Sequence, residues 1–333
     1  MQKYKDTEYL HATARVRAME NTMLDAKALV KMVDAKNAAE AYKVLAEAAI
    51  GQGYELADYE QAFTNNLLET YTLVAKISPM PGLADLFRYK YDGHNLKVLI
   101  KSRRLDRDYS ALLSPLGNVP ADELSAGLDA GSMPAALAPT LAQAGLDAQE
   151  QMAKTGDPQA VDIAIDRAVL GTMTAAAKAM DNAFLSRLVQ AQADIANIRA
   201  AIRLKRMKKE PAMLKLVLAE GGTIATGTIG EAYAKGYDEL LALISASPYG
   251  TALEPSYESL RGEQPLSLFE KLCDNYIASL FGAVKLVPFG IEPLVAYLYG
   301  KEWETNAARI VLASKLAGVP AAQITERLRD AYA

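Results

Sequence analysis

The sequence predicts an all-α protein, and three observations lead to that prediction. Apolar residues recur at mixed spacings of three and four, the pattern of an amphipathic helix. Alternating runs rich in Val, Ile and Thr, which would predict strands, are nearly absent. Clusters of Pro and Gly divide the chain into pieces of helical length. The first observation is clearest near the N-terminus, at Met23, Leu24, Leu29, Val30, Met32 and Val33.

Six clusters of helix-breaking residues separate the predicted helices in order along the chain. Proline lacks the backbone N–H that a helix interior needs, and glycine readily leaves the helical conformation. We therefore expect a helix to end before each cluster and another to begin after it. The clusters occupy residues 78–82, 114–120, 131–134, 156–158, 220–223 and 287–293.

Composition limits the class of protein. The 333 residues, 51% of them hydrophobic, are enough for two or three domains. The chain has 36 Lys and Arg and 40 Asp and Glu, which give a net charge of -4, so nucleic acid is not an expected partner. Cys273 is the only cysteine and the N-terminus lacks an apolar signal segment, which favours the cytosol. The late apolar stretch 285–300 is broken by prolines, so no membrane span is expected.

One phrase is written three times: DGHNLKVLI at 92–100, DIANIRAAI at 194–202 and WETNAARIV at 303–311. The copies are about 100 residues apart, much longer than the helical-pair repeats of roughly 33 to 47 residues. A glycine opens the next element after each copy, at Gly117, Gly222 and Gly318. The repeat predicts three helical units, 1–107, 108–210 and 211–333, in which the N- and C-terminal segments are free to pack together.

The phrase itself predicts a helix start. Asp and Asn are favoured at helix N-termini, where they accept a backbone hydrogen bond and place negative charge at the positive end of the dipole. In the third copy a Glu replaces the Asp. Direct contact with a partner is the alternative. The predicted helix-start residues are Asp92, Asn95, Asp194, Asn197, Glu302 and Asn306.

A search for reactive groups predicts no catalytic, cofactor-binding or metal site. The phosphate loop, the nucleophile elbow and the HExxH metal motif are all missing from the sequence, which has 2 histidines. Asp162 and Asp166 lie one helical turn apart and could hold a divalent ion, but solvated or capping roles are expected of them. Cys273, in an apolar run, is expected to be a buried thiol.

Two basic runs, 101–107 and 203–209, are the candidate interaction surfaces. The alternative is that these cations stand at helix C-termini, where the dipole favours them. Tyr-rich stretches at 86–91 and 295–303 predict either core or interface. The candidate interface residues are Arg103, Arg104, Arg203, Lys205, Arg206, Lys208 and Lys209.

Several segments together resemble one family. They are YLHATARVRAMENTMLD near the N-terminus, RYKYDGHNLKVLIKSRRL, EGGTI, LFEKLCDNYI, and the long C-terminal run from VAYLYGKEW to ITERL. In order and spacing the chain is similar to the C subunit of V-type/A-type ATPases, known as the d subunit in the vacuolar enzyme. The resemblance implies three similar helical domains around a pseudo-threefold axis, forming a funnel.

The resemblance also implies a function. Members of that family are non-catalytic rotor subunits of the central stalk, in complexes that drive ion transport or ATP synthesis. They lie at the cytoplasmic face of the membrane, as a socket between the axle subunits D and F and the proteolipid (c/K) ring. No cofactor is implied, and membrane association is peripheral. The alternative is a soluble tandem-helical adaptor unrelated to rotary ATPases.

Overall fold

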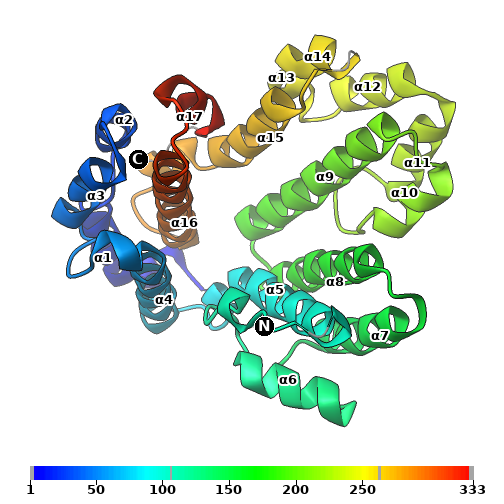
Figure 1. Cartoon of the computed structure of the whole chain (residues 1–333), viewed down its shortest axis with the longest axis horizontal. Helices are drawn as coiled ribbons and strands as arrows, with labels where there is room; N and C mark the ends of the chain where they lie inside the picture. The colour runs from blue at the N-terminus through cyan, green and yellow to red at the C-terminus, as the bar shows by residue number, and fades with distance from the viewer. Residues whose placement is uncertain (1–3, 106, 262–263, 330–333) are drawn as a thin grey trace. The chain divides into compact units, whose positions relative to one another are not determined.

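The computed structural model describes residues 4–105, 107–261 and 264–329. Figure 1 shows coiled ribbons throughout these ranges, and none of the residues described there is in a strand. The all-α prediction is confirmed. Within the same ranges, no helix is both long and apolar enough to cross a membrane.

The chain folds as two compact units. Unit 1 comprises residues 1–84 and 274–333, so it contains both ends of the chain, and unit 2 comprises residues 85–273. The boundaries fall in the first turn of α5 (Leu83–Leu105) and inside α15 (Ser267–Ser279). The division into three repeat units stays a prediction.

Unit 1 is built on the long helix α16, against which α1, α2, α3, α4 and α17 pack. Apolar side chains from five of these helices form one core, including Met32, Leu45, Phe63, Leu312 and Ile324. Burying such a side chain contributes about 1.5–3 kcal/mol. The helices of unit 1 are α1 (Leu10–Glu20), α2 (Ala26–Asp34), α3 (Ala38–Glu47), α4 (Tyr59–Ile77), α16 (Ile291–Leu316) and α17 (Ala321–Arg327), with 3-10 turns at Asp6–Tyr9, Leu56–Asp58 and Gly282–Leu286.

Unit 2 is a series of helices in which α7 packs on α8 and α8 packs on α9. Its two longest helices, α5 and α9, carry the first two phrases. The helices are α5 (Leu83–Leu105), α6 (Ala121–Ala130), α7 (Pro139–Thr155), α8 (Pro158–Ala179), α9 (Ala183–Arg206), α10 (Pro211–Val217), α11 (Thr226–Lys235), α12 (Tyr237–Ala246), α13 (Gly250–Leu253), α14 (Tyr257–Arg261) and α15 (Ser267–Ser279), with 3-10 turns at Ser110–Leu112 and Glu254–Ser256.

Most of the predicted breakers lie between helices. The last cluster, 287–293, does not, because α16 begins at Ile291 and contains Pro293 in its first turn. The cluster at 78–82 separates α4 from α5, and the cluster at 156–158 separates α7 from α8, with Pro158 as the first residue of α8. Among the described residues, two that are not glycine, Asp181 and Lys208, also turn the chain with a positive φ. Between α8 and α9, Asp181 adopts a φ of 49° and Asn182 caps α9 by accepting a hydrogen bond from the N–H of Leu185.

The prediction that the phrase starts a helix is wrong. Asp92 and Asn95 lie in the interior of α5, a helix of 23 residues, and Asp194 and Asn197 lie in that of α9, which has 24. Glu302 and Asn306 likewise lie inside α16 (26 residues), whose N-cap is Gly290. Asp and Asn are tolerated inside α5 and α9 because loops that follow these helices supply hydrogen-bond donors to their side chains.

Candidate functional site

Asn95, in the interior of α5, forms two hydrogen bonds with the backbone of one loop residue, Ser114. Its Nδ2 donates to the carbonyl oxygen of Ser114 at 2.8 Å, and its Oδ1 accepts from the N–H of Ser114 at 2.8 Å. The Asn95 side chain is fully buried. Because donor and acceptor are both used, the amide fixes the position and the orientation of the loop.

Asp92, one turn earlier on α5, holds the same loop further along. Its Oδ1 accepts from the N–H of Val119 at 3.1 Å, and its Oδ2 accepts from Nδ2 of Asn118 at 2.9 Å. A Cβ on Gly117 would lie 2.6 Å from Oδ1, so glycine is required for this close approach. Burial raises the pKa of Asp92, and the hydrogen bonds from Val119 and Asn118 oppose that rise.

Asn197 on α9 repeats the arrangement of Asn95. Its Nδ2 donates to the carbonyl oxygen of Ala219 at 2.8 Å, and its Oδ1 accepts from the N–H of Ala219 at 2.8 Å. The amide is again buried. The first two phrases are about 100 residues apart in the sequence. In both, the asparagine binds the backbone N–H and carbonyl oxygen of one loop residue.

Asp194 is the most heavily bonded carboxylate of the two phrases. It accepts from the N–H and the hydroxyl of Thr223 at 2.7 and 2.6 Å, from the N–H of Ile224 at 3.0 Å and from the hydroxyl of Tyr249 at 2.6 Å. A Cβ on Gly222 would lie 2.0 Å from its Oδ1. Gly222 is therefore the counterpart of Gly117.

We call these arrangements the first clamp (Asp92 and Asn95 with loop 114–119) and the second clamp (Asp194 and Asn197 with loop 219–224). Each clamp joins the interior of a long helix to the loop that leads into the next repeat helix, α6 or α11. Buried polar groups that are fully hydrogen-bonded rigidify the structure around them. The clamps therefore restrict movement between successive helices of unit 2.

The third phrase does not form such a clamp. Asn306 is exposed, and its Oδ1 accepts from Nη1 of Arg309 at 3.1 Å. Gly318, which was predicted to match the other two glycines, instead follows the C-terminus of α16 with a φ of 70°. The asparagine of the third copy recurs at about the same distance along the chain, but it does not make the contacts of the first two.

Unit 1 instead buries Lys301 and Glu304 of α16. Their Nζ and Oε2 are 2.5 Å apart, and the side chains are 4% and 1% exposed. The other oxygen of Glu304 accepts from the N–H of Leu24 at 2.8 Å, in the connection between α1 and α2. Nearby, Glu302 accepts a hydrogen bond from the hydroxyl of Tyr71 on α4. These contacts join α16 to α4 and to the connection between α1 and α2.

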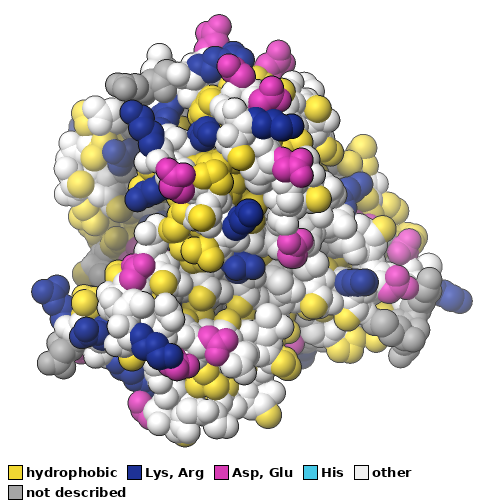
Figure 2. Space-filling model, turned by 90° about the vertical axis from the view of Figure 1, so that its right-hand side faces the viewer, with side chains coloured by type: hydrophobic (Ala, Val, Ile, Leu, Met, Phe, Trp, Pro, Cys, Tyr) yellow, Lys and Arg dark blue, Asp and Glu magenta, His cyan; other side chains and the backbone are white. Residues whose placement is uncertain are grey.

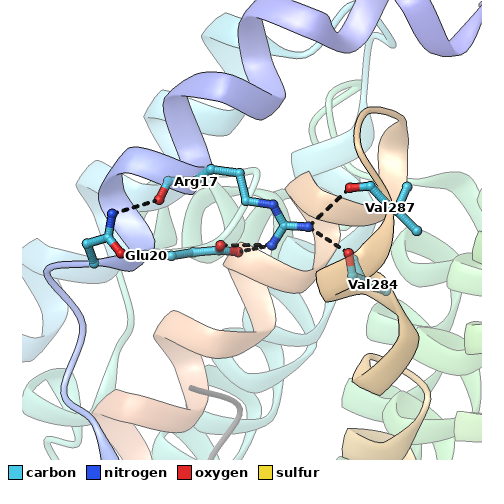
Figure 3. Close-up of polar contacts among 5 residues, drawn as sticks. Arg17, Glu20, Val284 and Val287 are labelled. Carbon is cyan, nitrogen blue, oxygen red and sulfur yellow. Dashed lines mark hydrogen bonds and ion pairs between the residues drawn. The ribbon is translucent and has the colours of Figure 1, made fainter.

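A second tie between the two ends of the chain is made by Arg17 of α1 (Figure 3). Its Nη2 donates to the carbonyl oxygens of Val284 at 2.6 Å and Val287 at 3.3 Å, while Nη1 pairs with Glu20 at 2.8 Å. The acceptors flank Leu286, whose side chain is 85% exposed. The loop before α16 is thus held from α1.

The basic residues predicted to form an interface lie in the last turns of α5 and α9 or just beyond them, as the helix-dipole alternative requires. Several are engaged inside unit 2. Arg103 pairs with Asp129 at 2.8 Å, Arg203 pairs with Glu270 at 2.6 Å, and Lys205 donates to the carbonyl oxygen of Tyr233 at 2.6 Å.

Arg206 donates to the carbonyl oxygens of Gln264 and Ser259, the latter at 3.0 Å. The exposed members of the candidate set, whose side chains a partner would meet, are Arg103, Arg104, Arg203, Lys208 and Lys209. Their role in an interface stays a prediction. Position 106 of the first run lies outside the described residues.

Asp162 and Asp166 of α8 are engaged in ion pairs with α5. Asp162 pairs with Lys101 at 2.5 Å, and Asp166 pairs with Lys97 at 2.6 Å. The described residues contain no group of three or more His, Cys, Asp or Glu placed to hold a metal ion. Cys273 is buried, as expected.

Sequence reasoning missed the loop partners of the phrases, above all Ser114, Ala219 and Tyr249, and the pair Lys301 and Glu304. One signal of the clamps was present in the sequence. The glycine that follows each of the first two phrases is the residue that the buried carboxylate requires beside it.

Comparison with known proteins gives a consistent result. A family model described as "ATP synthase (C/AC39) subunit" matches residues 12–327. The C subunit of the A-type ATP synthase of Methanosphaera stadtmanae is 24% identical, over 96% of this chain and 87% of that protein. The corresponding protein of Haloquadratum walsbyi is 26% identical, over 93% and 94%. The C subunit of the V-type sodium ATPase of Enterococcus hirae is 21% identical, over 98% and 99%.

Proposed function

The chain belongs to the ATP synthase (C/AC39) subunit family, and from that premise we propose that it is the non-catalytic central-stalk rotor subunit of a V-type or A-type ATPase. The observation that carries the proposal is the family match over nearly the whole chain. The same match contradicts the alternative of an adaptor unrelated to rotary ATPases.

In this role the chain is the socket that couples the axle, subunits D and F, to the membrane proteolipid ring. It lies at the cytoplasmic face and is held at the membrane through the complex. ATP hydrolysis in the head then drives ion transport through the ring, or the ion gradient drives ATP synthesis. We propose the three-domain funnel as the architecture that receives the axle.

The buried polar contacts support a coupling role in physical terms. A subunit that transmits torque must keep its helices in fixed relative positions, because deformation of the subunit would absorb work that should reach its partner. Asp194 and Asn197 hold the loop before α11 from the interior of α9. Lys301 and Glu304 hold the other end of the chain in unit 1. Such networks resist partial opening, since each exposed donor or acceptor would lose a buried partner.

Co-purification tests the proposal. The full-length chain is tagged in its own host, membranes are solubilised in mild detergent, and the recovered proteins are identified at low and at high salt. We expect an axle subunit and a proteolipid to be recovered together. Recovery of the chain alone under both conditions would contradict the proposal.

A functional measurement tests the coupling itself. Membranes depleted of the chain should retain ATP hydrolysis by the head but lose ATP-driven ion uptake, because the head and the ring are no longer connected. Adding back the purified chain should restore uptake. Loss of hydrolysis together with uptake, and no recovery on add-back, would argue against a coupling role.

A further inference from the structure

Four exposed apolar side chains of unit 2 follow the repeat, and a fifth, Leu268, which is 42% exposed, does not. Leu105 stands at the end of α5 and is 50% exposed, and Met207 stands directly after α9 and is 57% exposed. Each lies ten residues after the asparagine of its phrase. The two clamps establish that these asparagines are structurally equivalent, so Leu105 and Met207 occupy the same repeat position.

A second exposed leucine follows in each repeat, shortly before the loop residue that the asparagine holds. Leu112 precedes Ser114 and is 57% exposed, and Leu216 precedes Ala219 and is 56% exposed. The two repeats therefore present similar pairs of apolar side chains to solvent, the first member at the same repeat position and the second within two residues of it. Single exposed apolar residues are common, but their recurrence in two repeats points to a binding role.

Both leucines are presented from a fixed backbone. The carbonyl oxygen of Leu112 lies 2.7 Å from Nε2 of His94 on α5. The carbonyl oxygen of Leu216 accepts from Nη1 of Arg167 on α8 at 3.0 Å. A backbone held this way loses little further freedom when a partner covers the residue, which favours binding.

Exposed cations accompany the apolar side chains. We call Leu105, Leu112, Arg104 and Arg107 the first edge; both arginines are exposed. Basic residues outnumber acidic ones between 103 and 112, although the whole chain has a net charge of -4.

The second edge comprises Met207, Leu216, Lys208, Lys209 and Lys215, and its three lysines are exposed. Basic residues outnumber acidic ones here too. Figure 2 displays the side of the molecule where α10 and α11 lie, and hydrophobic side chains occur there among charged side chains of both signs. The charge of both edges complements an acidic surface.

We propose that the first and second edges are equivalent attachment points for a protein partner that presents one acidic and apolar feature in several identical copies. Two edges with the same chemistry fit a partner that repeats its own surface. A partner that presents a single surface, such as the tip of the axle, would not require both repeats to keep the same exposed apolar and basic side chains. The proposal rests on the proposed function, within which the membrane ring is the partner built from identical subunits.

Each edge is a small contact, and two such contacts to one assembly act by avidity. Linking two weak contacts raises the overall affinity by far more than either contact alone supplies. Removing one edge should therefore weaken ring binding, and removing both should nearly abolish it. Binding should also fall with salt, because exposed charges are screened.

The experiment compares edge variants in the co-purification of the full chain. One variant carries Leu105→Ser and Leu112→Ser, a second carries Met207→Ser and Leu216→Ser, and a third carries all four changes. The matched control carries Leu10→Ser and Val30→Ser, which remove side chains that are 59% and 57% exposed but lie outside both edges. Circular dichroism verifies that every variant is folded.

We expect each edge variant to recover several-fold less proteolipid, and the combined variant to recover at least about tenfold less, as avidity predicts. Recovery of the axle subunits should not change, and the control should match the wild type. A combined variant that recovers the wild-type amount of proteolipid overturns the inference and leaves the proposed function intact. A wild-type chain that recovers neither axle nor ring overturns both.

A second arm separates protein from lipid. The purified chain is sedimented with vesicles of phosphatidylcholine, with and without phosphatidylserine. We expect no binding that depends on the edges. If the wild type binds the anionic vesicles and the combined variant does not, while ring recovery is unchanged, the edges bind lipid headgroups and the inference is wrong.

A charge arm uses Lys208→Glu with Lys209→Glu, and Lys27→Glu on α2 as the control. These lysines are exposed. We expect the reversal, but not the control, to lower ring recovery and to flatten its dependence on salt, because the screened attraction has been removed. An unchanged salt profile would contradict the assignment of an acidic partner.

Discussion

The second and third phrases share a sequence pattern but use it differently. In unit 2, Asp194 and Asn197 hold a loop that follows them in the chain. In unit 1, Asn306 is exposed, and Glu304, paired with Lys301, accepts from the N–H of Leu24, which comes from the other end of the chain. In both units a buried carboxylate accepts hydrogen bonds from a connecting segment. The segment follows the carboxylate in the sequence in unit 2, whereas in unit 1 it comes from near the N-terminus, and the residues around the carboxylate differ accordingly.

The largest expected effect is in unit 1. Lys301→Met should lower the free energy of unfolding by about 3–5 kcal/mol, because it leaves the carboxylate of Glu304 buried without its cation. Urea unfolding followed by circular dichroism measures the loss. Arg309→Met is the control, since its ion pair with Glu60 is partly exposed at 37% and 52% and should contribute no more than about 1 kcal/mol.

The double variant Lys301→Met with Glu304→Gln sharpens this prediction. It removes both charges, while the glutamine oxygen still accepts from the N–H of Leu24. The double variant should therefore be more stable than Lys301→Met alone. A double variant as unstable as the sum of the two single variants would show that Lys301 and Glu304 do not act as a pair.

In unit 2, Asp194→Ala should lower the free energy of unfolding by about 3 kcal/mol, because four hydrogen bonds to a buried carboxylate are lost. Asp162→Ala is the matched control, an ion-pair carboxylate that is 43% exposed. It should cost less than about 1 kcal/mol. Equal losses in the two variants would mean that the second clamp adds nothing beyond a surface ion pair.

Two glycines should respond to alanine with opposite signs. Gly222→Ala places a Cβ 2.0 Å from Oδ1 of Asp194 and should destabilise the protein by about 1–3 kcal/mol. Gly171, inside α8, has no atom within 4 Å of the added Cβ. Gly171→Ala should stabilise by about 0.5–1 kcal/mol, since alanine favours the helix. Thermal unfolding of both variants provides the comparison, and a neutral Gly222→Ala would disprove the close approach.

The smallest expected effect is a dependence of stability on pH in the first clamp. The pKa of Asp92 is raised in the folded state, so the folded protein binds this proton more tightly than the unfolded chain. The contribution of Asp92 to stability is then greatest at low pH and falls as pH rises from about 4 through the raised pKa. The stability of the wild type relative to Asp92→Asn should decline over that window. A difference that grows with pH would have the wrong sign for a raised pKa.

Much of the fold was predictable because it depends on local preferences. The all-α class follows from apolar spacing, and the turns follow from Pro and Gly, which exclude a helix interior whatever surrounds them. The turn at Asp181 escaped prediction because an Asp with positive φ has no unique signature in sequence. Lys101 and Asp162 were both noticed, yet their pairing depends on how α5 packs against α8.

By itself the sequence determined that the protein is helical, that a phrase recurs in it, and that its order of segments resembles one family. Only the tertiary structure decided that the phrase lies inside long helices and what it does there. The carboxylate of Asp92 or Asp194 could accept backbone hydrogen bonds equally well at a helix start or in a helix interior. The neighbouring residues in the sequence therefore cannot show which of these positions the residue occupies. The donors that decide the matter, Val119, Thr223 and Tyr249, come from loops and helices that only the packed chain brings within hydrogen-bond distance.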